Sequence, residues 1–476
     1  MCSSNKERRV DREILQNRPF ESLAIGDSAS VVRAASRDDI DLFAAMSGDV
    51  NPAHLDAAFA AHDLFGHVVV HGMWTGALVS AVLGTKLPGP GTIYLDQTLE
   101  FRHPVAPGDT VTATVTVKEK HPEKRIVLLD TRCTNQDGQV VLRGTATVIA
   151  PDKPIAWERV PAPDVAVRRH DRYETFVRDA REQPPLRTAV VHPCSPDAIR
   201  AAIDARDEHL IDPILIGPEA KIRAAAEAAG VNLAGVSIEA VEHSHAAAAR
   251  AVELGGMGQV AALMKGSLHT DELLAAVVGP ASLLRTERRI SHVYAMDVPA
   301  YPKPLLITDA AINIAPTLEQ KRDICQNAVD LLHVLGIERP RVAVLAAVET
   351  VNPKMPSTLD AAALTVMAAR GQISGAIVDG PLAFDNAVSA IAAQSKGIIS
   401  PVAGQADILL VPDLEAGNML AKQLMYFAGA DGAGLVLGAR LPIILTSRAD
   451  SLRVRIASAA LAKLVAERTR AGALAS

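Results

Sequence analysis

Two neighbouring segments near the N-terminus constrain the fold most strongly. Residues 73–83 (MWTGALVSAVL) are apolar almost all round and rich in small side chains, which predicts a helix buried on all sides. Residues 110–118 (TVTATVTVK) alternate threonine with apolar side chains, the period-two pattern of an antiparallel strand with one buried face. Residues 126–133 and 140–148 show the same pattern less regularly. We therefore expect an α+β domain over residues 18–150, with a sheet wrapped around one helix.

The second half of the chain has a different pattern. From residue 187 to 476, short apolar runs alternate with helical stretches, which predicts an α/β fold with a mainly parallel sheet. It opens with a strand at 188–191, and Ser195-Pro196-Asp197 then indicates a helix start. Further strands are expected at 213–216, 260–264, 342–346, 376–378, 408–411 and 443–445. Residues 151–186, rich in Pro and Arg, are expected to form a linker with a short helix.

Composition narrows the class of protein. A net charge of -6 and an aromatic content of 3% argue against a nucleic-acid partner. No apolar run is long enough for a membrane span, and the first 15 residues lack the apolar core of a secretory signal. The four cysteines (Cys2, Cys133, Cys194 and Cys325) show no CxxC spacing, so neither a zinc site nor a disulfide framework is indicated. A cytoplasmic location with no membrane partner is expected.

The first candidate site lies in residues 47–56 (SGDVNPAHLD). Pro52 biases Asn51 away from helix and can begin the next one, so the segment predicts a sharp turn that aims Asp49 and His54 at one point. The alternative is that Asp49 only caps a helix and His54 lies on the surface, because caps are commoner than active sites. His71-Gly72-Met73 opens the apolar helix, where free backbone N–H groups can bind an oxyanion.

The order DVNPAHLD and then FGHVVVHGMWTGAL resembles the (R)-specific enoyl-CoA hydratases of the MaoC family, which have a hot-dog fold. The resemblance covers residues 20–150. It implies that Asp49 and His54 are the catalytic pair that activates water and transfers protons, that Asn51 holds the turn, and that the N–H of Gly72 binds the thioester oxygen. Hot-dog units of the family pair, so it also implies a homo-oligomer, at least a dimer.

The second candidate site lies near the C-terminus. Gly429, Gly432, Gly434 and Gly438 crowd between a predicted helix and strand, where backbone N–H groups of Gly432 and Gly434 can approach an anion. The alternative is that these glycines only form helix stops and tight turns. Ser447-Arg448 follows a predicted strand, and a guanidinium beside a hydroxyl suits a phosphate and a reacting oxygen or sulfur. Neither a P-loop nor a dinucleotide fingerprint is present.

Four segments in order resemble the phosphate acetyl- and butyryltransferase family over residues 187–473: VAALMKGSLHTDELLAAV, LLRTERRISHVYAM, GNMLAKQLMYFAGADGAGLVLG and PIILTSRADS. The resemblance implies two α/β subdomains, about 187–300 with 440–476 and about 301–439, with the active site in the cleft between them. It implies direct attack of inorganic phosphate on an acyl-CoA thioester, without a metal or a tightly bound cofactor.

The same resemblance implies a role for several residues. Ser447 would bond near the sulfur or carbonyl, Arg448 would hold phosphate, and Arg285 would bind CoA phosphates or inorganic phosphate. Acetyl-type members carry an Asp two helical turns after the serine, and here that position is near Val454. Asp450 is the nearest carboxylate, so either Asp450 substitutes or no base is needed.

A fusion of two acyl-CoA enzymes is the function that both resemblances predict. Two alternatives stay open: one half, more readily the C-terminal, is a catalytically silent acyl-CoA-binding module, or the hot-dog half hydrolyses thioesters or dehydrates 3-hydroxyacyl thioesters. His243 and His245 are expected on a solvated helix edge for lack of a third ligand. Three further groups are weaker candidates for the cleft: Glu287 to Arg289, Asp309 with Asn313, and Lys354.

Overall fold

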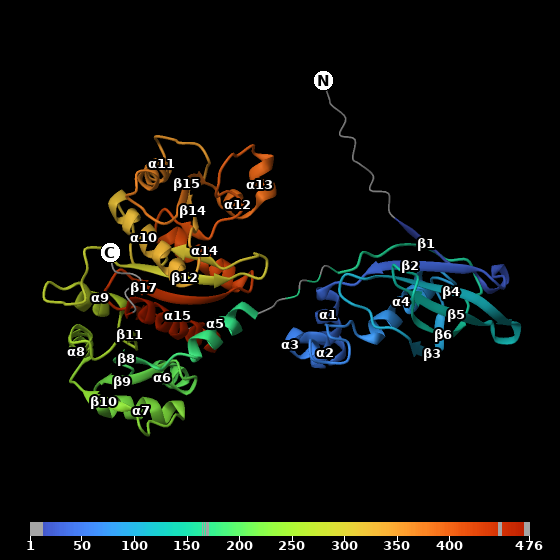
Figure 1. Cartoon of the computed structure of the whole chain (residues 1–476), viewed down its shortest axis with the longest axis horizontal. Coiled ribbons are helices and arrows are strands. Elements are labelled where there is room, and N and C mark those ends of the chain that lie inside the picture. The colour runs from blue at the N-terminus through green and yellow to red at the C-terminus, as the bar shows by residue number, and fades with distance from the viewer. Residues whose placement is uncertain (1–12, 164, 166, 168–170, 446–449, 471–476) are drawn as a thin grey trace. The chain divides into compact units, whose positions relative to one another are not determined.

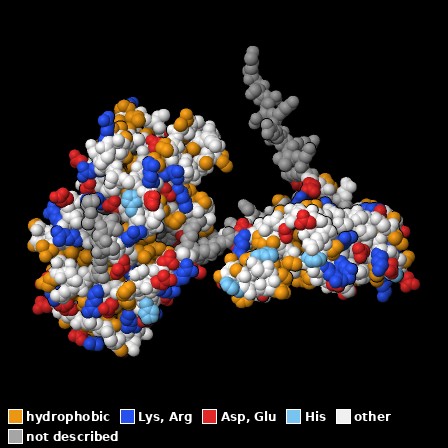
Figure 2. All heavy atoms as spheres, viewed as in Figure 1, with side chains coloured by type: hydrophobic (Ala, Val, Ile, Leu, Met, Phe, Trp, Pro, Cys, Tyr) orange, Lys and Arg blue, Asp and Glu red, His pale blue; other side chains and the backbone are white. Residues whose placement is uncertain are grey.

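The computed structural model describes residues 13–163, 165, 167, 171–445 and 450–470. The chain divides into two compact units, residues 1–167 (unit 1) and 168–476 (unit 2), and each is described by itself. On the visible face of each unit, basic and acidic side chains are interspersed with hydrophobic ones (Figure 2). No helix among the described residues combines the length and the apolar character needed to cross a membrane.

Unit 1 is built around a five-stranded antiparallel sheet in the order β2-β4-β5-β6-β3, with helix α4 against it (Figure 1). Its elements are β1 (Ile14–Gln16), β2 (Ser28–Ala34), α1 (Arg37–Ser47), α2 (Pro52–Leu55), α3 (Ala57–Ala60), α4 (Gly72–Thr85), β3 (Ile93–Phe101), β4 (Thr110–His121), β5 (Ile126–Thr134), β6 (Val140–Ile149) and β7 (Ala156–Glu158). The predicted hot-dog architecture is confirmed.

The core of unit 1 follows from the two patterns that the sequence shows. The apolar residues of β4 (Val111, Ala113, Val115 and Val117) are buried, while its threonines are half-buried on the opposite face. They share one hydrophobic core with Trp74, Leu78, Val79, Val82 and Leu83 of α4. The expectation that this helix is buried on all sides is wrong. Met73, Ala77, Ser80 and Gly84 are exposed, because the sheet covers only one side of the helix.

The predicted linker contains elements of both units. Strand β7 pairs antiparallel with β1, and Ile14 lies opposite Glu158. Helix α5 (Asp171–Arg181) packs against the C-terminal helix α15 (Leu452–Arg470) and buries Val177 and Ala180.

Unit 2 contains one eleven-stranded sheet within its described residues, in the order β10-β9-β8-β11-β18-β17-β12-β13-β16-β14-β15. Its strands are β8 (Leu186–Val191), β9 (Ile211–Gly217), β10 (Ser237–Ala240), β11 (Ala262–Lys265), β12 (Ser291–Asp297), β13 (Leu305–Thr308), β14 (Arg341–Leu345), β15 (Ile377–Leu382), β16 (Ile408–Leu410), β17 (Asp431–Leu437) and β18 (Ile443–Ile444). Its other helices are α6 (Pro196–Asp207), α7 (Glu219–Ala229), α8 (Ser244–Gly256), α9 (Thr270–Val278), α10 (Leu318–Val334), α11 (Pro356–Ala369), α12 (Phe384–Val388), α13 (Ala390–Ser395) and α14 (Leu414–Tyr426).

Two parallel halves of this sheet are joined by antiparallel strands. The half from β10 to β18 is parallel, as is the half from β13 to β15, and β17 and β12 join them with antiparallel pairing. One continuous sheet therefore runs through both of the subdomains that the resemblance implies. The predicted helix start is confirmed, since α6 begins at Pro196 and the side chain of Ser195 accepts a hydrogen bond from the N–H of Ala198.

Candidate active sites

The turn that carries Asp49 forms as the sequence predicts. Helix α1 ends at Ser47, and Gly48 turns the chain with a left-handed φ of 77°, a conformation that glycine adopts without strain. Asn51 caps α2 through its side-chain oxygen, which accepts a hydrogen bond from the N–H of Ala53 at 3.1 Å. Asn51 therefore holds the turn, while Asp49 itself is exposed.

His54 lies on α2 and is half-buried beside this turn. Its Nδ1 is 2.7 Å from the carbonyl oxygen of Val69. A carbonyl only accepts hydrogen bonds, so in the neutral ring Nδ1 carries the proton and Nε2 keeps a lone pair. The side chains of Asp49 and His54 offer a carboxylate oxygen and a ring nitrogen within 4.8 Å of each other. The structure thus brings together the two residues that the sequence singles out.

A third residue joins this group. His71, the N-cap of α4, is buried and completes a set with Asp49 and His54 whose ligand-type atoms all lie within 4.8 Å of one another. These are ligand types that zinc uses. However, the rings of His54 and His71 are stacked with centroids 3.9 Å apart and planes tilted by 34°. Lone pairs lie in the ring plane, so stacked imidazoles do not direct them at a common point, and this geometry disfavours a metal.

A cavity of about 270 Å³ adjoins His54, and both His54 and Gly72 line it. Gly72 is the first residue of α4, where backbone N–H groups have no partner within the helix. A Cβ at this position would lie 3.0 Å from Cε1 of Phe101, so a side chain here would compete with Phe101 for space. The cavity therefore combines an imidazole with a helix N-terminus, which suits a ligand with an electron-rich oxygen.

In unit 2, Ser447 and Arg448 lie outside the described residues. In the sequence they follow β18. The strand beside β18 is β11, which ends at Lys265 before Gly266. The strand beside β11 is β8, which leads into His192. A Cβ on Gly266 would lie 2.3 Å from the carbonyl oxygen of Val191, so only glycine fits between these strand ends.

The hydroxyl of Ser267 ties the two strand ends together, because it donates to the carbonyl of His192 at 2.7 Å and accepts from the N–H of Cys194 at 3.1 Å. Burial lowers the pKa of His192. No role was predicted for His192, Lys265 or Ser267. His192 and Lys265 directly follow predicted strands, and ligands of open α/β sheets bind at such strand ends.

The glycines proposed to bind an anion lie elsewhere than predicted. Gly432 and Gly434 are buried inside β17 and not in a loop. The N–H of Gly434 donates to Oγ of Ser458, and a Cβ on Gly434 would lie 2.8 Å from the carbonyl oxygen of Leu445. A Cβ on Gly432 would lie 2.7 Å from Cε of Met425. These glycines permit close packing, so their prediction as substrate-binding residues is corrected.

Two aromatic side chains of β12 face this part of β17. The rings of His292 and Tyr294 meet edge to face with centroids 4.5 Å apart. Burial lowers the pKa of His292 to about 4. Burial, with a smaller contribution from the charge of Asp450, raises the pKa of Tyr294 to about 12. Asp450 is half-buried, and its carbonyl accepts from Nε of Arg455. Neither His292 nor Tyr294 was singled out from the sequence, because a strand was not predicted there.

Arg285 lies beside the turn between β17 and β18. It belongs to the segment before β12, and its neighbour Thr286 donates to the carbonyl of Gly438 in the β17–β18 turn. Arg285 lines a cavity of about 570 Å³ together with Arg288, Arg289 and residues of α9 and α10. Acidic side chains (Asp271, Glu287, Glu319 and Asp323) also line it, so its charge is mixed.

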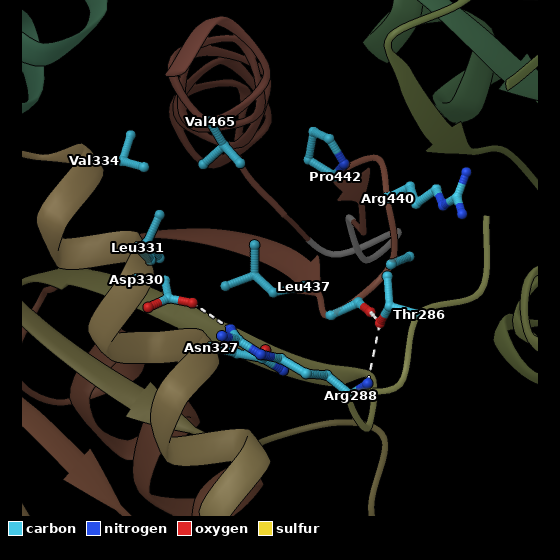
Figure 3. A pocket seen from close by; sticks show the side chains of 12 residues that line it. Thr286, Arg288, Asn327, Asp330, Leu331, Val334, Leu437, Arg440, Pro442 and Val465 are labelled. Atoms are coloured by element: carbon cyan, nitrogen blue, oxygen red, sulfur yellow. Dashed lines mark hydrogen bonds and ion pairs between the residues drawn. The ribbon is translucent and has the colours of Figure 1, made fainter. Parts of the chain in front are cut away.

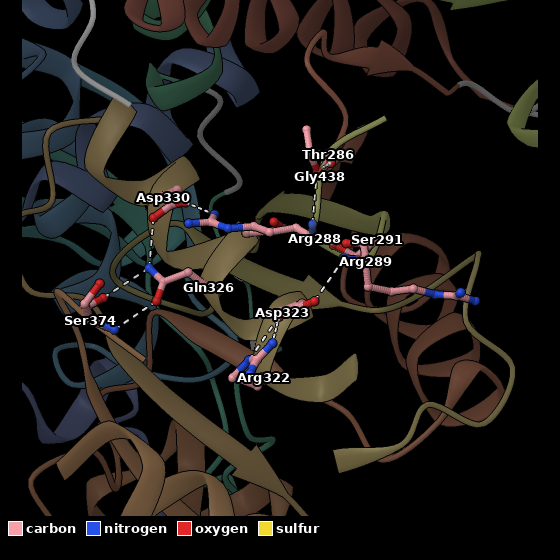
Figure 4. A network of polar contacts seen from close by, with 11 residues as sticks. Thr286, Arg288, Arg289, Ser291, Arg322, Asp323, Gln326, Asp330, Ser374 and Gly438 are labelled. Carbon is pink, nitrogen blue, oxygen red and sulfur yellow. Dashed lines mark hydrogen bonds and ion pairs between the residues drawn. The ribbon is translucent and has the colours of Figure 1, made fainter. Parts of the chain in front are cut away.

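Two arginines of this segment bond to acidic side chains of α10: Arg288 pairs with Asp330, and the backbone N–H of Arg289 donates to Asp323 (Figure 4). Nε of Arg289 donates to the side chain of Asn313 at 2.6 Å, and the backbone N–H of Asn313 donates to the buried carboxylate of Asp309. Asp309 and Asn313 therefore support an arginine and do not themselves face an open cleft. Arg288 pairs with Asp330 and borders a second cavity of about 340 Å³, where Arg440 and Asp330 lie on opposite sides (Figure 3).

The remaining candidates have structural partners. His243 caps α8 by accepting from the N–H of Ala246, and His245 lies 3.3 Å from Glu272. Lys354 is exposed, and its N–H donates to the side chain of Asn352.

Comparisons with known proteins match the two units to two families. The profile described as "MaoC like domain" matches residues 20–137, and that described as "Phosphate acetyl/butaryl transferase" matches residues 239–463. The phosphate acetyltransferase of Rhizobium meliloti is 58% identical over 305 residues, which cover 64% of this chain and 96% of that protein.

Two solved structures are similar. A branched-chain phosphotransacylase from Enterococcus faecalis V583 is 32% identical, with a TM-score of 0.53, over 59% of this chain and 99% of its own. R-Hydratase PhaJ1 from Pseudomonas aeruginosa is 44% identical over 33% of this chain and 99% of its own, with a TM-score of 0.32. The chain therefore belongs to the phosphate acetyl/butyryltransferase family and carries a MaoC-like domain in front of the transferase domain.

Proposed function

We propose that the chain is a bifunctional acyl-CoA enzyme. Unit 2 transfers an acyl group from acyl-CoA to inorganic phosphate, and unit 1 reversibly hydrates 2-enoyl-CoA to (3R)-3-hydroxyacyl-CoA. The first activity is supported by the 58% sequence identity with a phosphate acetyltransferase, in a match that covers 96% of that relative. The second activity is supported by the nearby side chains of Asp49 and His54, of which His54 lines a cavity together with Gly72, the first residue of α4.

The transfer is a direct exchange in this proposal. A phosphate oxygen attacks the thioester carbonyl carbon, the C–S bond breaks, and acyl phosphate and CoA thiolate leave. Arg448 holds the phosphate and Ser447 bonds near the sulfur or carbonyl, so the protein contributes positioning and charge stabilisation. Val454, which lies near the position of the Asp of acetyl-type members, is buried on α15 and supplies no base. A thiolate is a good enough leaving group for the exchange to proceed without one.

The charges of Arg285 and Arg289 favour a role in binding the phosphates of CoA. They line one cavity, and Thr286 beside Arg285 contacts Gly438 in the β17–β18 turn. Arg289 is well suited because Asn313 fixes its Nε and leaves the end of the guanidinium for an anion. CoA thioesters and phosphate are substrates here, and no bound cofactor takes part.

Hydration uses general acid–base chemistry in this proposal. The water oxygen adds to the β-carbon while one member of the Asp49/His54 pair takes a water proton, and a proton is delivered to the α-carbon. The N–H of Gly72 donates a hydrogen bond to the thioester oxygen and so stabilises the negative charge that develops there. The fixed tautomer of His54 supports this role, because Nε2 is left with the lone pair that a base requires.

We also infer that unit 1 forms at least a homodimer through β3. This strand lies at one edge of the sheet and exposes Ile93, Tyr94, Leu95 and Phe101. An exposed hydrophobic edge strand is a template for pairing with another chain. Helix α4 lies next to this strand, since a Cβ on its half-buried Gly76 would be 3.4 Å from Cδ1 of Leu99 in β3. A cytoplasmic location fits the free cysteines Cys133, Cys194 and Cys325.

Thiol release from acetyl-, butyryl- and isobutyryl-CoA, with and without inorganic phosphate, tests the transfer. Release that requires phosphate and disappears in Ser447→Ala is expected. Release without phosphate would indicate thioester hydrolysis, and no release from any of these substrates would indicate a silent binding module. Addition of water to crotonyl-CoA tests unit 1. It should yield the 3R product and be lost in Asp49→Asn but not in Asp137→Asn, an exposed carboxylate in the β5–β6 turn.

A further inference from the structure

His71 contacts both members of the proposed acid–base pair. It is the N-cap residue of α4, yet its side chain makes no capping hydrogen bond. Instead, Nε2 of His71 lies 3.0 Å from the carbonyl oxygen of Asp49. The ring is only 1% exposed, so this hydrogen bond forms in a dry environment, where it is stronger than in water.

The faces of the same ring are also occupied. The centroid of the His71 ring lies 3.9 Å from that of the His54 ring and 4.9 Å from that of the Phe43 ring, on α1. His71 therefore contacts the elements on both sides of the Asp49 turn, α1 before it and α2 after it. Asp49 is exposed, and among the described residues its other hydrogen bonds are local, to Ser47 and Asn51.

The two histidines hold their protons on opposite nitrogens. The carbonyl of Asp49 requires that Nε2 of His71 carry the proton, whereas the carbonyl of Val69 requires that Nδ1 of His54 carry it. Each tautomer is thus set by a backbone carbonyl, and a rotated His71 ring would lose its bond to Asp49. The buried Nδ1 of His71 has no hydrogen-bond partner among the described residues, so it offers no alternative anchor.

We infer that His71 is a positioning residue for hydration: it holds the main chain of Asp49 and the ring face of His54, and so sets the geometry between the carboxylate and Nε2. This inference rests on the proposed hydratase function of unit 1. It is distinct from the role of Gly72, because His71 acts through the other two residues and not on the substrate. General acid–base groups that lose their positions by about 1 Å can lose roughly 100-fold in rate.

Two substitutions separate the hydrogen bond from the ring contact. His71→Phe keeps a ring against His54 but removes the donor to Asp49, and His71→Gln keeps an N–H donor but removes the ring. We expect each variant to lower kcat for hydration of crotonyl-CoA by about 10- to 100-fold, with a smaller change in KM. The exposed His62, which bonds to the carbonyl of Ala58 in α3, supplies the control variant His62→Gln.

A double-mutant cycle distinguishes positioning from a general loss of stability. If His71 acts through Asp49, His71→Phe should have little further effect on the residual rate of Asp49→Asn. If the losses of rate caused by His71→Phe and Asp49→Asn multiply in the double variant, the inference is overturned. An unchanged kcat in both His71 variants would overturn it too. No hydration by the wild-type chain with any 2-enoyl-CoA would reject the proposed function, and the inference with it.

The wild-type protein provides a measurement that does not depend on the variants folding. Nitrogen-15 chemical shifts of the histidine rings report which ring nitrogen is protonated. In its neutral form, the His71 ring should carry its proton on Nε2 and the His54 ring on Nδ1. The opposite tautomer at His71 would contradict the bond to Asp49 on which the inference depends.

Discussion

Nδ1 of His54 donates its proton to the carbonyl oxygen of Val69, 2.7 Å away, so Nε2 is the nitrogen available for chemistry. Asparagine can imitate the Nδ1 donor but has no atom at the place of Nε2, whereas glutamine extends to that place and loses the bond to Val69. We predict that both variants lose hydration by about 100- to 10,000-fold, because neither can transfer a proton there. The free energy of unfolding should fall by about 1 kcal/mol more in His54→Gln than in His54→Asn. If either variant hydrated the substrate as fast as the wild type does, His54 would have no part in the chemistry.

The exposed edge of β3 leads to a prediction about assembly. Leu95→Lys places a charge on this edge strand, where Leu95 is 50% exposed. If β3 pairs with a second copy, the substitution should weaken the dimer, which sedimentation or light scattering detects as a lower mass at equal concentration. Val32→Lys, on β2 at the other edge of the same sheet, is the matched control. If only Val32→Lys lowered the mass of the assembly, the interface would lie at β2.

Gly432 and Gly434 offer a matched pair of substitutions in one strand. A Cβ at Gly434 meets the backbone oxygen of Leu445, which cannot move without moving the chain that leads to Ser447. A Cβ at Gly432 meets the end of the flexible Met425 side chain. We predict that Gly434→Ala lowers stability by about 1–3 kcal/mol and phosphate-dependent thiol release by up to about 100-fold. Gly432→Ala should lower both less, and the reverse order would contradict this account of β17.

Buried His292 predicts that unit 2 loses stability in mild acid. Burial lowers its pKa in the folded protein to about 4, whereas in the unfolded chain it is about 6.5. Between these values the unfolded chain binds a proton that the folded chain does not. The free energy of unfolding therefore falls as pH drops from about 6.5 to about 4, by a few kcal/mol at most. Urea unfolding at several pH values should show a shallower pH dependence in His292→Asn than in wild type. An identical dependence would mean that His292 is protonated in the fold or does not control acid unfolding.

The parts of the fold that the sequence predicted are those with a strong local signal. The alternation in β4 and the Ser195-Pro196 cap both reflect local chemistry, and both formed as expected. Strand β17 was missed because its glycines are typical of turns, and it exists as a strand through contacts with Met296 and Ser458 from distant parts of the chain. Strand β12 was missed because His292 and Tyr294 interrupt its apolar pattern.

The candidate sites divide in the same way. Asp49, Asn51 and His54 lie within six residues, so the local turn that Asn51 caps already brings them together. The contribution of His71 depends on packing between α1, α2 and α4, which no local pattern encodes. Similarly, the support of Arg289 by Asn313 joins residues 24 positions apart through a side-chain hydrogen bond.

The most direct test of two independent activities in one chain measures both on the same three proteins. Hydration of crotonyl-CoA and phosphate-dependent thiol release from butyryl-CoA should be determined for the wild type, Asp49→Asn and Ser447→Ala. We predict that the wild type has both activities, that Asp49→Asn retains only thiol release, and that Ser447→Ala retains only hydration. A wild-type protein that lacks either activity, or a folded variant in which one substitution abolishes both, would contradict the proposal.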